Sequence, residues 1–225
     1  MASHLVVRAC PPFRVPGDER ALLDGPELER AQAMAARTRE DFLAGRVAQR
    51  RFAAGLLGVE ASDLTACYSC PRCGTGAEIS HGRPGYLLRG APAPLLLSLS
   101  RAAGWTLLAG VVDPDPGLRL GIDAEDPART DFEGFDAVVL TPAEQADLAG
   151  LHGAALLRGR ARLWARKEAW LKMTGTGLRT APNTVDVRQD GQDGPAGRPG
   201  LRDLPGSETG LPAELVAAVA LAVNS

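Results

Sequence analysis

Several stretches of the chain carry the residue pattern of β-strands. Residues 4–9, 95–100, 105–112 and 118–124 are short, β-prone and rich in aliphatic residues. The segment 105–112 is apolar almost throughout, which predicts a buried strand. A fifth apolar segment, 215–223, consists mostly of valine, alanine and leucine, and it suits a strand or a short helix equally well.

Capping residues predict two helices in the first half of the chain. One helix starts at residues 24–26, Asp-Gly-Pro, because proline suits the first helical turn. A second, arginine-rich helix is predicted to begin at a capping box formed by Thr38 and Asp41. It runs to about residue 57, where Gly58 is a common type of helix stop.

The second half of the chain combines one strong helix with irregular segments. Thr141 and Glu144 form another capping box, and residues 156–173 carry the clearest helical pattern. The segments 67–86 and 189–210 are rich in glycine and proline and are predicted to be loops. Strands and helices do not alternate regularly, and no glycine fingerprint follows a strand, so the pattern favours an α+β fold.

Composition and charge exclude some classes of function. The chain has 225 residues, 25 basic and 27 acidic, and its net charge of −2 argues against broad nucleic-acid binding. Residues 1–8 lack the apolar core of a signal peptide, and the run 215–223 is far shorter than the roughly 20 residues of a membrane span. We therefore expect a cytoplasmic protein without membrane contact, whose 4 cysteines are thiols or metal ligands rather than disulfides.

Residues 121–125, Gly-Ile-Asp-Ala-Glu, are the first segment with candidate chemistry. On a strand, Asp123 and Glu125 point to the same face, where their charges repel each other. A hard cation such as Mg²⁺ relieves this repulsion, because it prefers oxygen ligands and keeps waters and substrate phosphates in its shell. Taken alone, such a pair is more often two solvated carboxylates on an exposed strand.

Residues 164–172, Trp-Ala-Arg-Lys-Glu-Ala-Trp-Leu-Lys, are the second such segment. Trp164, Glu168 and Lys172 recur every four residues and share one helical face. They suit the edge of an active site, but also a surface helix with a Glu-to-Lys pair worth about 0.2–0.5 kcal/mol. The preceding arginines either solvate the helix or face an acidic partner: Arg158, Arg160, Arg162 and Arg166.

Together the two segments resemble the 4′-phosphopantetheinyl transferase superfamily. Its signature is Gly-[Ile/Val]-Asp-x-Glu, then Trp-x-x-Lys-Glu-Ala-x-x-Lys and Gly-x-Gly-Leu, which here is residues 175–178. A weaker likeness extends to residues 42–46, 82–84 and 141–144. The chain length is similar to that of the two-lobed, surfactin-synthetase-activator type rather than the shorter acyl-carrier-protein synthases, which trimerise.

The resemblance implies two similar α+β lobes that form a pseudo-dimer with the active site in the cleft between them. Residues 1–115 would form the N-terminal lobe, with coenzyme A phosphate and carrier contacts, and 116–225 the lobe with the magnesium and catalytic motifs. The implied reaction moves 4′-phosphopantetheine from coenzyme A to a serine of an apo acyl or peptidyl carrier protein and releases 3′,5′-adenosine bisphosphate. A monomer that uses Mg²⁺, or Mn²⁺, is expected.

The resemblance also implies roles for individual residues. Asp123, Glu125 and Glu168 would hold the metal ion against the pyrophosphate of coenzyme A. Glu168 would act as general base towards the serine, and Lys172 would neutralise the leaving phosphate. Coenzyme A contacts are implied for Arg46, Arg83, Ser98, Lys172 and Arg39.

One residue departs from the family pattern. Relatives carry Ser-His-Ser where this chain has Ser98, Leu99 and Ser100, and leucine cannot hydrogen-bond a phosphate. Losing a charge-assisted contact costs on the order of 1.5–3 kcal/mol, or about 10- to 100-fold in affinity. Three outcomes stay open: weaker coenzyme A binding, substitution by Arg101, or a catalytically impaired relative that binds coenzyme A or carriers without turnover.

Cys67, Cys70 and Cys73 form two overlapping C-x-x-C steps, and His81 follows them. Three thiolates and an imidazole are the ligands of some tetrahedral zinc sites. The spacing is tight for one ion, and the second C-x-x-C knuckle of a zinc ribbon is missing. Free thiols are therefore the favoured interpretation, and structural zinc is the alternative.

Overall fold

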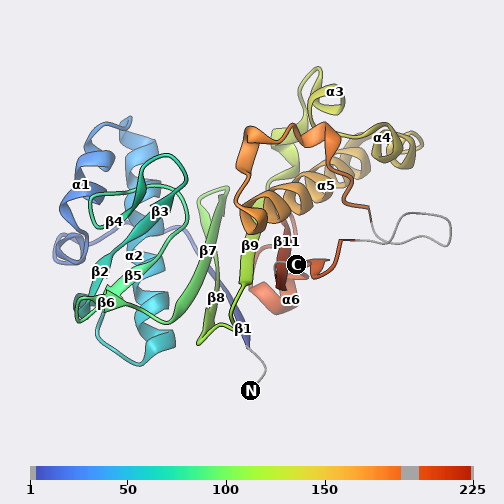
Figure 1. Cartoon of the computed structure of the whole chain (residues 1–225). Helices are drawn as coiled ribbons and strands as arrows, with labels where there is room; N and C mark the ends of the chain where they lie inside the picture. Colours follow the sequence, from blue (N-terminus) through green and yellow to red (C-terminus); the bar gives the residue numbers. More distant parts are fainter. Residues whose placement is uncertain (1–3, 189–197, 224–225) are drawn as a thin grey trace. The chain divides into compact units, whose positions relative to one another are not determined.

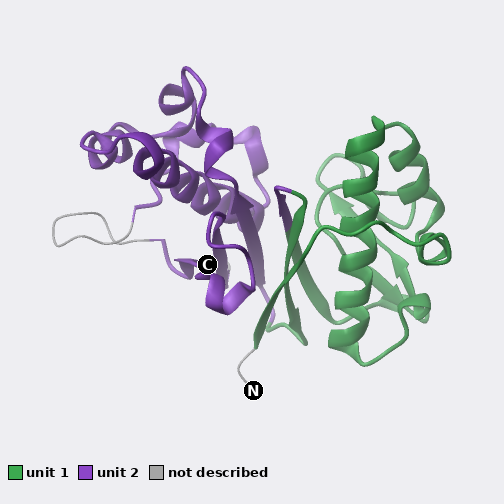
Figure 2. Cartoon of the chain, turned by 180° about the vertical axis from the view of Figure 1, so that it is seen from behind, with its two compact units in different colours: residues 1–99, 104–115 green, residues 100–103, 116–225 purple. Residues whose placement is uncertain are grey.

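The computed structural model describes residues 4–188 and 198–223 of the chain. None of the described helices is long and apolar enough to cross a membrane. The chain forms two compact units, coloured separately in Figure 2: Met1–Leu99 with Gly104–Asp115, and Ser100–Ala103 with Pro116–Ser225.

The two units resemble the predicted lobes in extent. The predicted ranges, 1–115 and 116–225, differ from the units only at residues 100–103. Helices and strands occur in both units, which confirms the α+β class. The predicted cleft between the lobes stays a prediction.

The first unit is built around one long helix, α2 (Ala36–Leu57), which lies against strand β8 (Trp105–Val112) (Figure 1). Strand β8 is the middle strand of a three-stranded sheet and pairs antiparallel with β1 (Leu5–Cys10). The third strand is β7 (Leu95–Ala102). All three strands were predicted from their apolar patterns, and β8 is buried as expected.

The other elements of the first unit are short. The segment 67–86 was predicted to be a loop, and that prediction was wrong: it contains a small hairpin, because Tyr68 to Cys70 pair with Gly74 to Gly76. The short elements are η1 (Glu19–Leu22), α1 (Gly25–Gln32), η2 (Ala61–Asp63), β2 (Leu64–Ala66), β3 (Tyr68–Cys70), β4 (Gly74–Gly76), β5 (Tyr86–Leu88) and β6 (Ala91–Pro92).

The C-terminal end of α2 was predicted correctly, and its start was not. Gly58 has the left-handed conformation (φ 66°) that a helix-ending glycine supplies without strain. The helix begins at Ala36, and no side chain caps it. Because only residues 33–35 link α1 to α2, Thr38 lies inside the first turn of α2 and cannot cap it.

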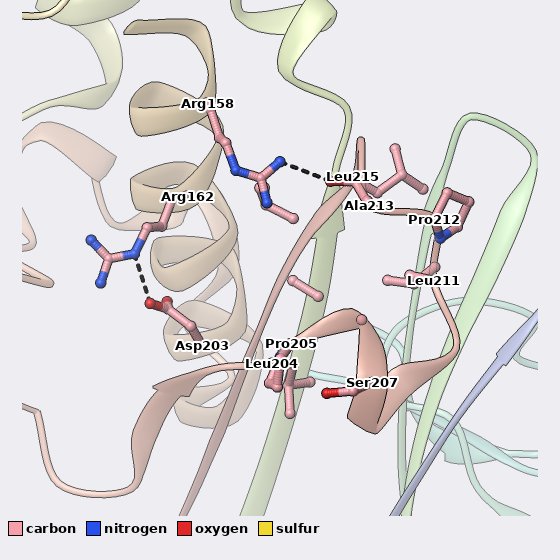
Figure 3. Close-up of a pocket in the computed structure, with 13 residues that line it drawn as sticks. Arg158, Arg162, Asp203, Leu204, Pro205, Ser207, Leu211, Pro212, Ala213 and Leu215 are labelled. Atoms are coloured by element: carbon pink, nitrogen blue, oxygen red, sulfur yellow. Dashed lines mark hydrogen bonds and ion pairs between the residues drawn. The ribbon is translucent and has the colours of Figure 1, made fainter. Parts of the chain in front are cut away.

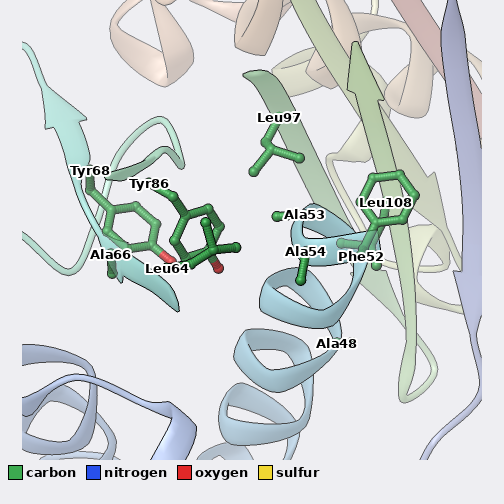
Figure 4. Packing of buried hydrophobic residues seen from close by; sticks show 10 residues of the cluster. All are labelled: Ala48, Phe52, Ala53, Ala54, Leu64, Ala66, Tyr68, Tyr86, Leu97 and Leu108. Carbon is green, nitrogen blue, oxygen red and sulfur yellow. The ribbon is translucent and has the colours of Figure 1, made fainter. Parts of the chain in front are cut away.

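The apolar core of the first unit gathers where α2 meets the strands. Figure 4 shows Phe52 and three alanines of α2 facing Leu64, Tyr86 and residues of β7 and β8. Small alanine side chains on α2 let the strands approach the helix closely. Leu99 of β7 packs against this cluster, so its aliphatic side chain has a structural partner.

A buried polar network holds α1 to α2 in the same unit. Glu27 closes the capping box of α1 with Asp24 and is itself almost fully buried. The Arg50 guanidinium donates to Glu27 at 3.0 Å and to Asp24 at 2.6 Å, and Tyr68 donates its hydroxyl to Glu27 at 3.1 Å. Burial without such partners would cost each charge several kcal/mol, so the network members stabilise one another.

The second unit is built around another 22-residue helix, α5 (Gly153–Thr174), which packs on β9 (Leu118–Glu125) and β11 (Val216–Val223). Strand β11 pairs antiparallel with β9 and with β10 (Leu201–Asp203). The segment 215–223 is therefore a strand, one of its two predicted alternatives. The remaining elements are η3 (Pro127–Thr130), α3 (Phe135–Val139), α4 (Pro142–Leu148), η4 (Gly177–Arg179), η5 (Pro182–Thr184) and α6 (Gly206–Thr209).

The prediction of a loop over residues 189–210 is partly wrong. Residues 189–197 lie outside the described part of the chain. Within the rest, β10 forms because residues 201–203 add to the edge of β11, with Leu201 opposite Ala220. Such a short edge strand has no periodicity of its own, so its sequence is typical of a loop.

A buried ion pair joins α5 to α4 in the second unit. The Lys167 ammonium lies 2.7 Å from the Glu144 carboxylate, and both side chains are fully buried. Lys167 also donates to the carbonyls of Pro182 and Val185. Glu144 completes the predicted capping box with Thr141, which the structure confirms.

Lys167→Ala is predicted to destabilise the protein by about 3–5 kcal/mol, because it leaves the Glu144 carboxylate buried without its cation. Urea denaturation measures the loss. Arg162→Ala is the matched control, since Arg162 and its partner Asp203 are both about one-third to one-half exposed, and it should cost less than about 1 kcal/mol. Equal losses in the two variants would contradict the assignment.

Candidate active site

Strand β9 turns one face towards α5, and the first acidic motif lies on that face. Gly121, Asp123 and Glu125 alternate along the strand and therefore point the same way. A Cβ atom at position 121 would lie 2.5 Å from the Met173 amide nitrogen and would overlap the Ala169 carbonyl. Only glycine allows this contact, so the glycine of the motif sets how closely α5 approaches the carboxylates.

Asp123 is the most buried member of the acidic group, with 3% of its surface exposed. Its Oδ1 accepts hydrogen bonds from the Lys172 ammonium at 2.6 Å and from the Ser100 hydroxyl at 2.7 Å. Lys172 also donates to the Ile122 carbonyl at 3.1 Å. The second oxygen, Oδ2, is buried and has no hydrogen-bond partner among the described residues. A buried carboxylate oxygen without a donor normally costs free energy, unless a ligand or ion completes it.

Glu125 and Glu168 are half-buried, and neighbouring charges shift the pKa values of both. Burial raises the pKa of Glu125 to about 8, and the negative charges of Asp123 and Glu168 add to that effect while Lys172 opposes it. Burial likewise raises the pKa of Glu168, with Lys172 opposing and Asp123 adding. The three carboxyl groups are thus close enough to influence one another electrostatically, and Lys172 partly offsets their negative charge.

The residues of this cluster suit a hard divalent cation. Three carboxyl groups in one environment, one of them with an unpartnered buried oxygen, supply the oxygen ligands that Mg²⁺ prefers. Within the described residues their oxygens do not all come within 4.8 Å of one another. Magnesium sites commonly take one or two carboxylates and fill the shell with water and phosphate oxygens, so this spacing is compatible with an ion.

The second motif divides into structural and chemical residues. Trp164 and Trp170 pack against buried clusters that include Leu163 and Met173, so the tryptophans belong to the packing of α5. Lys167 forms the buried pair with Glu144. Glu168 and Lys172 lie near the carboxylates of β9: Lys172 donates to Asp123, and the charge of Asp123 raises the pKa of Glu168.

Ser100 is a site residue that sequence reasoning missed. Ser98 was predicted to contact coenzyme A; it is buried on β7, and its contact with the substrate stays a prediction. Ser100 lies two positions further along, and it is the Ser100 hydroxyl that donates to Asp123. The Ser-x-Ser spacing places both hydroxyls on one strand face, which was the available signal.

The three arginines predicted to contact coenzyme A lie in the first unit. Arg46 is 8% exposed, lies over the rings of Phe42 and Tyr68, and donates to the Ser80 carbonyl at 2.9 Å. Arg39 donates to three carbonyls at the end of α1, at distances of 2.9 to 3.3 Å. Arg83 pairs its backbone with Ser69. Phosphate contacts of these three arginines stay predictions.

Most of the arginines at the start of α5 are engaged within the second unit. Arg160 forms two hydrogen bonds with Asp136, and Arg166 is buried and donates to Asp203 and to the Val187 carbonyl. Figure 3 shows Arg158 and Arg162 at a pocket of about 690 Å³ between α5 and the segment 203–217. None of the acidic cluster lines this pocket. Arg158 is the exposed member of the group, and it donates to the Ala213 carbonyl at 2.9 Å.

Comparison with known proteins assigns the segment that holds the acidic cluster. The family model described as the 4′-phosphopantetheinyl transferase superfamily matches residues 119–220. This segment of the chain is similar to that superfamily. All four charged residues of the cluster, on β9 and α5, lie inside the matched segment.

One curated relative supports the assignment of the superfamily domain. The chain is similar to "4′-phosphopantetheinyl transferase 1" of Fusarium mangiferae, with 28% identity over 120 residues. The alignment covers 44% of this chain and 41% of that protein. The chain therefore spans about two-fifths of the curated relative that it matches.

Gly121→Ala is predicted to destabilise the second unit by at least 1–3 kcal/mol, because the new methyl group overlaps the backbone of α5. Gly55→Ala is the matched control. Gly55 is helical, and a methyl group added there would meet no described residue outside its own stretch of helix within 4 Å. Its replacement should stabilise the protein by roughly 0.5–1 kcal/mol. Denaturant midpoints of the two variants should move in opposite directions. A stable Gly121→Ala protein would refute the close approach.

Magnesium is predicted to raise the melting temperature of the wild-type protein by binding the folded carboxylates. Saturation at 100 times the dissociation constant gives about 2.7 kcal/mol. Magnesium should not raise the melting temperature of Glu125→Gln, although this variant should fold and melt cooperatively in EDTA. Glu133→Gln, an exposed acid of the same unit, should respond like wild type. Scanning fluorimetry with EDTA and with Mg²⁺ measures these melting temperatures. If magnesium raised the melting temperature of Glu125→Gln as much as that of wild type, Glu125 would not be a ligand.

Proposed function

We propose that this protein transfers 4′-phosphopantetheine from coenzyme A to a serine of an apo acyl or peptidyl carrier protein and releases 3′,5′-adenosine bisphosphate. One observation carries the proposal. The buried Asp123 carboxylate keeps an unpartnered oxygen beside Lys172, in a segment that matches the superfamily. This arrangement is suited to a divalent metal ion, whose positive charge would offset the negative charge of the three carboxyl groups and would attract the pyrophosphate of coenzyme A.

Asp123, Glu125 and Glu168 are the residues that would hold Mg²⁺ or Mn²⁺. Such an ion supplies positive charge to the pyrophosphate of coenzyme A and to the oxygens that become more negative as the bond to phosphorus breaks. Ser100 contributes indirectly: by donating to Oδ1 of Asp123, its hydroxyl fixes the rotation of the carboxylate. Lys172 does the same from the helix side.

Glu168 is the proposed general base. Its raised pKa brings the carboxyl group closer to neutral pH, where a base exchanges protons most effectively. The serine hydroxyl of the carrier gives its proton to Glu168, directly or through a water, as its oxygen bonds to the β-phosphorus of coenzyme A. The bond from that phosphorus to the bridging oxygen breaks, and the electron pair leaves with 3′,5′-adenosine bisphosphate.

Lys172 is the proposed group that stabilises the leaving phosphate. Its ammonium lies on the same helical face as Glu168, one turn further along α5, and reaches the acidic cluster. A cation fixed by the helix needs no reorganisation when negative charge develops nearby. Phosphoryl-type transfer depends mainly on positioning and charge neutralisation, which these residues supply without a covalent intermediate.

The proposed partner is a carrier protein from fatty-acid, polyketide or non-ribosomal peptide synthesis. Carrier recognition helices are acidic, and the exposed guanidinium of Arg158 is the candidate among the α5 arginines. Arg160 and Arg166 are engaged with Asp136 and Asp203 and are not offered for this contact.

Glu168→Gln is predicted to reduce transfer by at least 100-fold, because amide nitrogen cannot accept the serine proton and contributes no charge to the metal site. The purified protein is incubated with coenzyme A, Mg²⁺ and an apo carrier domain, and intact-protein mass spectrometry weighs the carrier. Wild type should add one phosphopantetheine group, and EDTA should abolish the gain. Glu29→Gln, an exposed acid of α1, is the matched control and should retain activity.

A wild-type protein that binds coenzyme A but modifies none of several carriers would reject the transferase proposal. Leu99, which packs against the core of the first unit, would then mark a relative that binds without turnover. If Glu168→Gln kept full activity, the protein would still be a transferase, but Glu168 would not be its general base.

A further inference from the structure

The β3–β4 hairpin brings together three ligand-type side chains that the transferase proposal does not use. The ligand atoms of Cys70, Cys73 and His81 all lie within 4.8 Å of one another. They are the one group of this kind among the described histidine, cysteine and acidic residues. The Cys73 sulfur lies 3.4 Å from Nε2 of His81.

These distances agree with a tetrahedral zinc site. Zinc binds thiolate sulfur at about 2.3 Å and imidazole nitrogen at about 2.0–2.1 Å, so two such ligands lie roughly 3.6 Å apart. The sulfur–nitrogen distance at Cys73 and His81 is close to this value. Sulfur and imidazole ligands select zinc over magnesium, which prefers oxygen.

The backbone holds the two cysteines in position without a metal. Cys70 ends β3, Gly74 begins β4 opposite it, and the Cys73 amide donates to the Cys70 carbonyl at 3.2 Å to close the turn. Gly74 has a φ of +86°, which glycine adopts without strain.

A separate set of backbone contacts delivers His81 to the hairpin. Ser69 and Arg83 exchange two hydrogen bonds, at 2.9 and 2.8 Å, so the segment after His81 runs alongside β3. Gly82 lies so close to β3 that a Cβ atom there would overlap the Ser69 carbonyl. The three side chains are thus assembled by the turn at Gly74 and by the close approach of Gly82 to β3.

Cys67 differs from the other two cysteines of the hairpin. It lies three positions before Cys70 along an extended segment, so the two side chains point to opposite faces. In the described structure it is outside the group of close ligand atoms. Cys67 therefore serves as a matched control for Cys70.

We propose that Cys70, Cys73 and His81 bind a zinc ion, with water as the fourth ligand. The exposure of Cys73 and the partial exposure of His81 leave the remaining tetrahedral position open to solvent. The ion ties residues 79–83, which have little regular structure, to the β3–β4 hairpin. The Ser80 carbonyl in this segment accepts from Arg46, so the ion also steadies the surroundings of Arg46 and Arg83.

Metal content tests the site without coenzyme A or a carrier, so it succeeds or fails independently of the proposed function. The full chain is purified without chelators and through a tag that contains no histidine, and zinc is measured by inductively coupled plasma mass spectrometry. Wild type, Cys67→Ser and Cys10→Ser should retain about one zinc per chain. Cys70→Ser, Cys73→Ser and His81→Ala should lose nearly all of it.

Cobalt substitution guards against variants that lose zinc because they misfold. Zinc-free wild type titrated with Co²⁺ should show a thiolate-to-cobalt charge-transfer band and the visible bands of tetrahedral cobalt, and added zinc should abolish both. Removal of zinc should also speed backbone hydrogen exchange in residues 79–83 while leaving α5 unchanged.

Three results would overturn the site. The first is a wild-type protein that contains no zinc and gives no tetrahedral cobalt spectrum. The second is a loss of zinc in Cys67→Ser as large as that in Cys70→Ser. The third is a mass lower by two hydrogens in freshly purified protein, with Cys70 and Cys73 joined, since the pair would then be a disulfide.

Discussion

The close contact between α5 and β9 at Gly121 is the constraint on which the candidate active site depends. Without a side chain at this position, the backbone of α5 rests directly on the strand. Lys172 then reaches Asp123 at 2.6 Å, and Glu168 comes into the field of the same carboxylate. A wider separation of helix and strand would leave the two halves of the signature on separate surfaces, unable to act on one substrate.

This contact also explains why the acidic cluster has more negative charge than its neighbouring cations offset. Burial and mutual repulsion raise the pKa values of Glu125 and Glu168, and the positive charge of Lys172, with that of Arg129 at Glu125, offsets this only in part. The unpartnered oxygen of Asp123 is the local sign of the same imbalance. A second donor here would make the fold more stable, and its absence among the described residues is consistent with the proposed cation site.

Local patterns in the sequence predicted the elements that form this site, because each has a signal of its own. The strand with Asp123, the helix with Glu168 and the capping box at Thr141 all follow from nearby residues. Partners distant in sequence had no such signal. The Ser100 hydrogen bond to Asp123 depends on how β7 lies in the fold, and β10 exists only because β11 offers it an edge.

The two lysines of the second motif show why residue type alone cannot assign chemistry. Lys167 and Lys172 lie five residues apart on one helix, but a difference in angle of about 140° between their positions sends them to different environments. Lys167 is buried with Glu144 and fixes the fold, whereas Lys172 is partly exposed and meets Asp123. A lysine buried with a structural carboxylate cannot leave it without a cost of several kcal/mol. Lys172 keeps 30% of its side chain exposed to water, and that difference is why the proposed function assigns the leaving phosphate to Lys172 and not to Lys167.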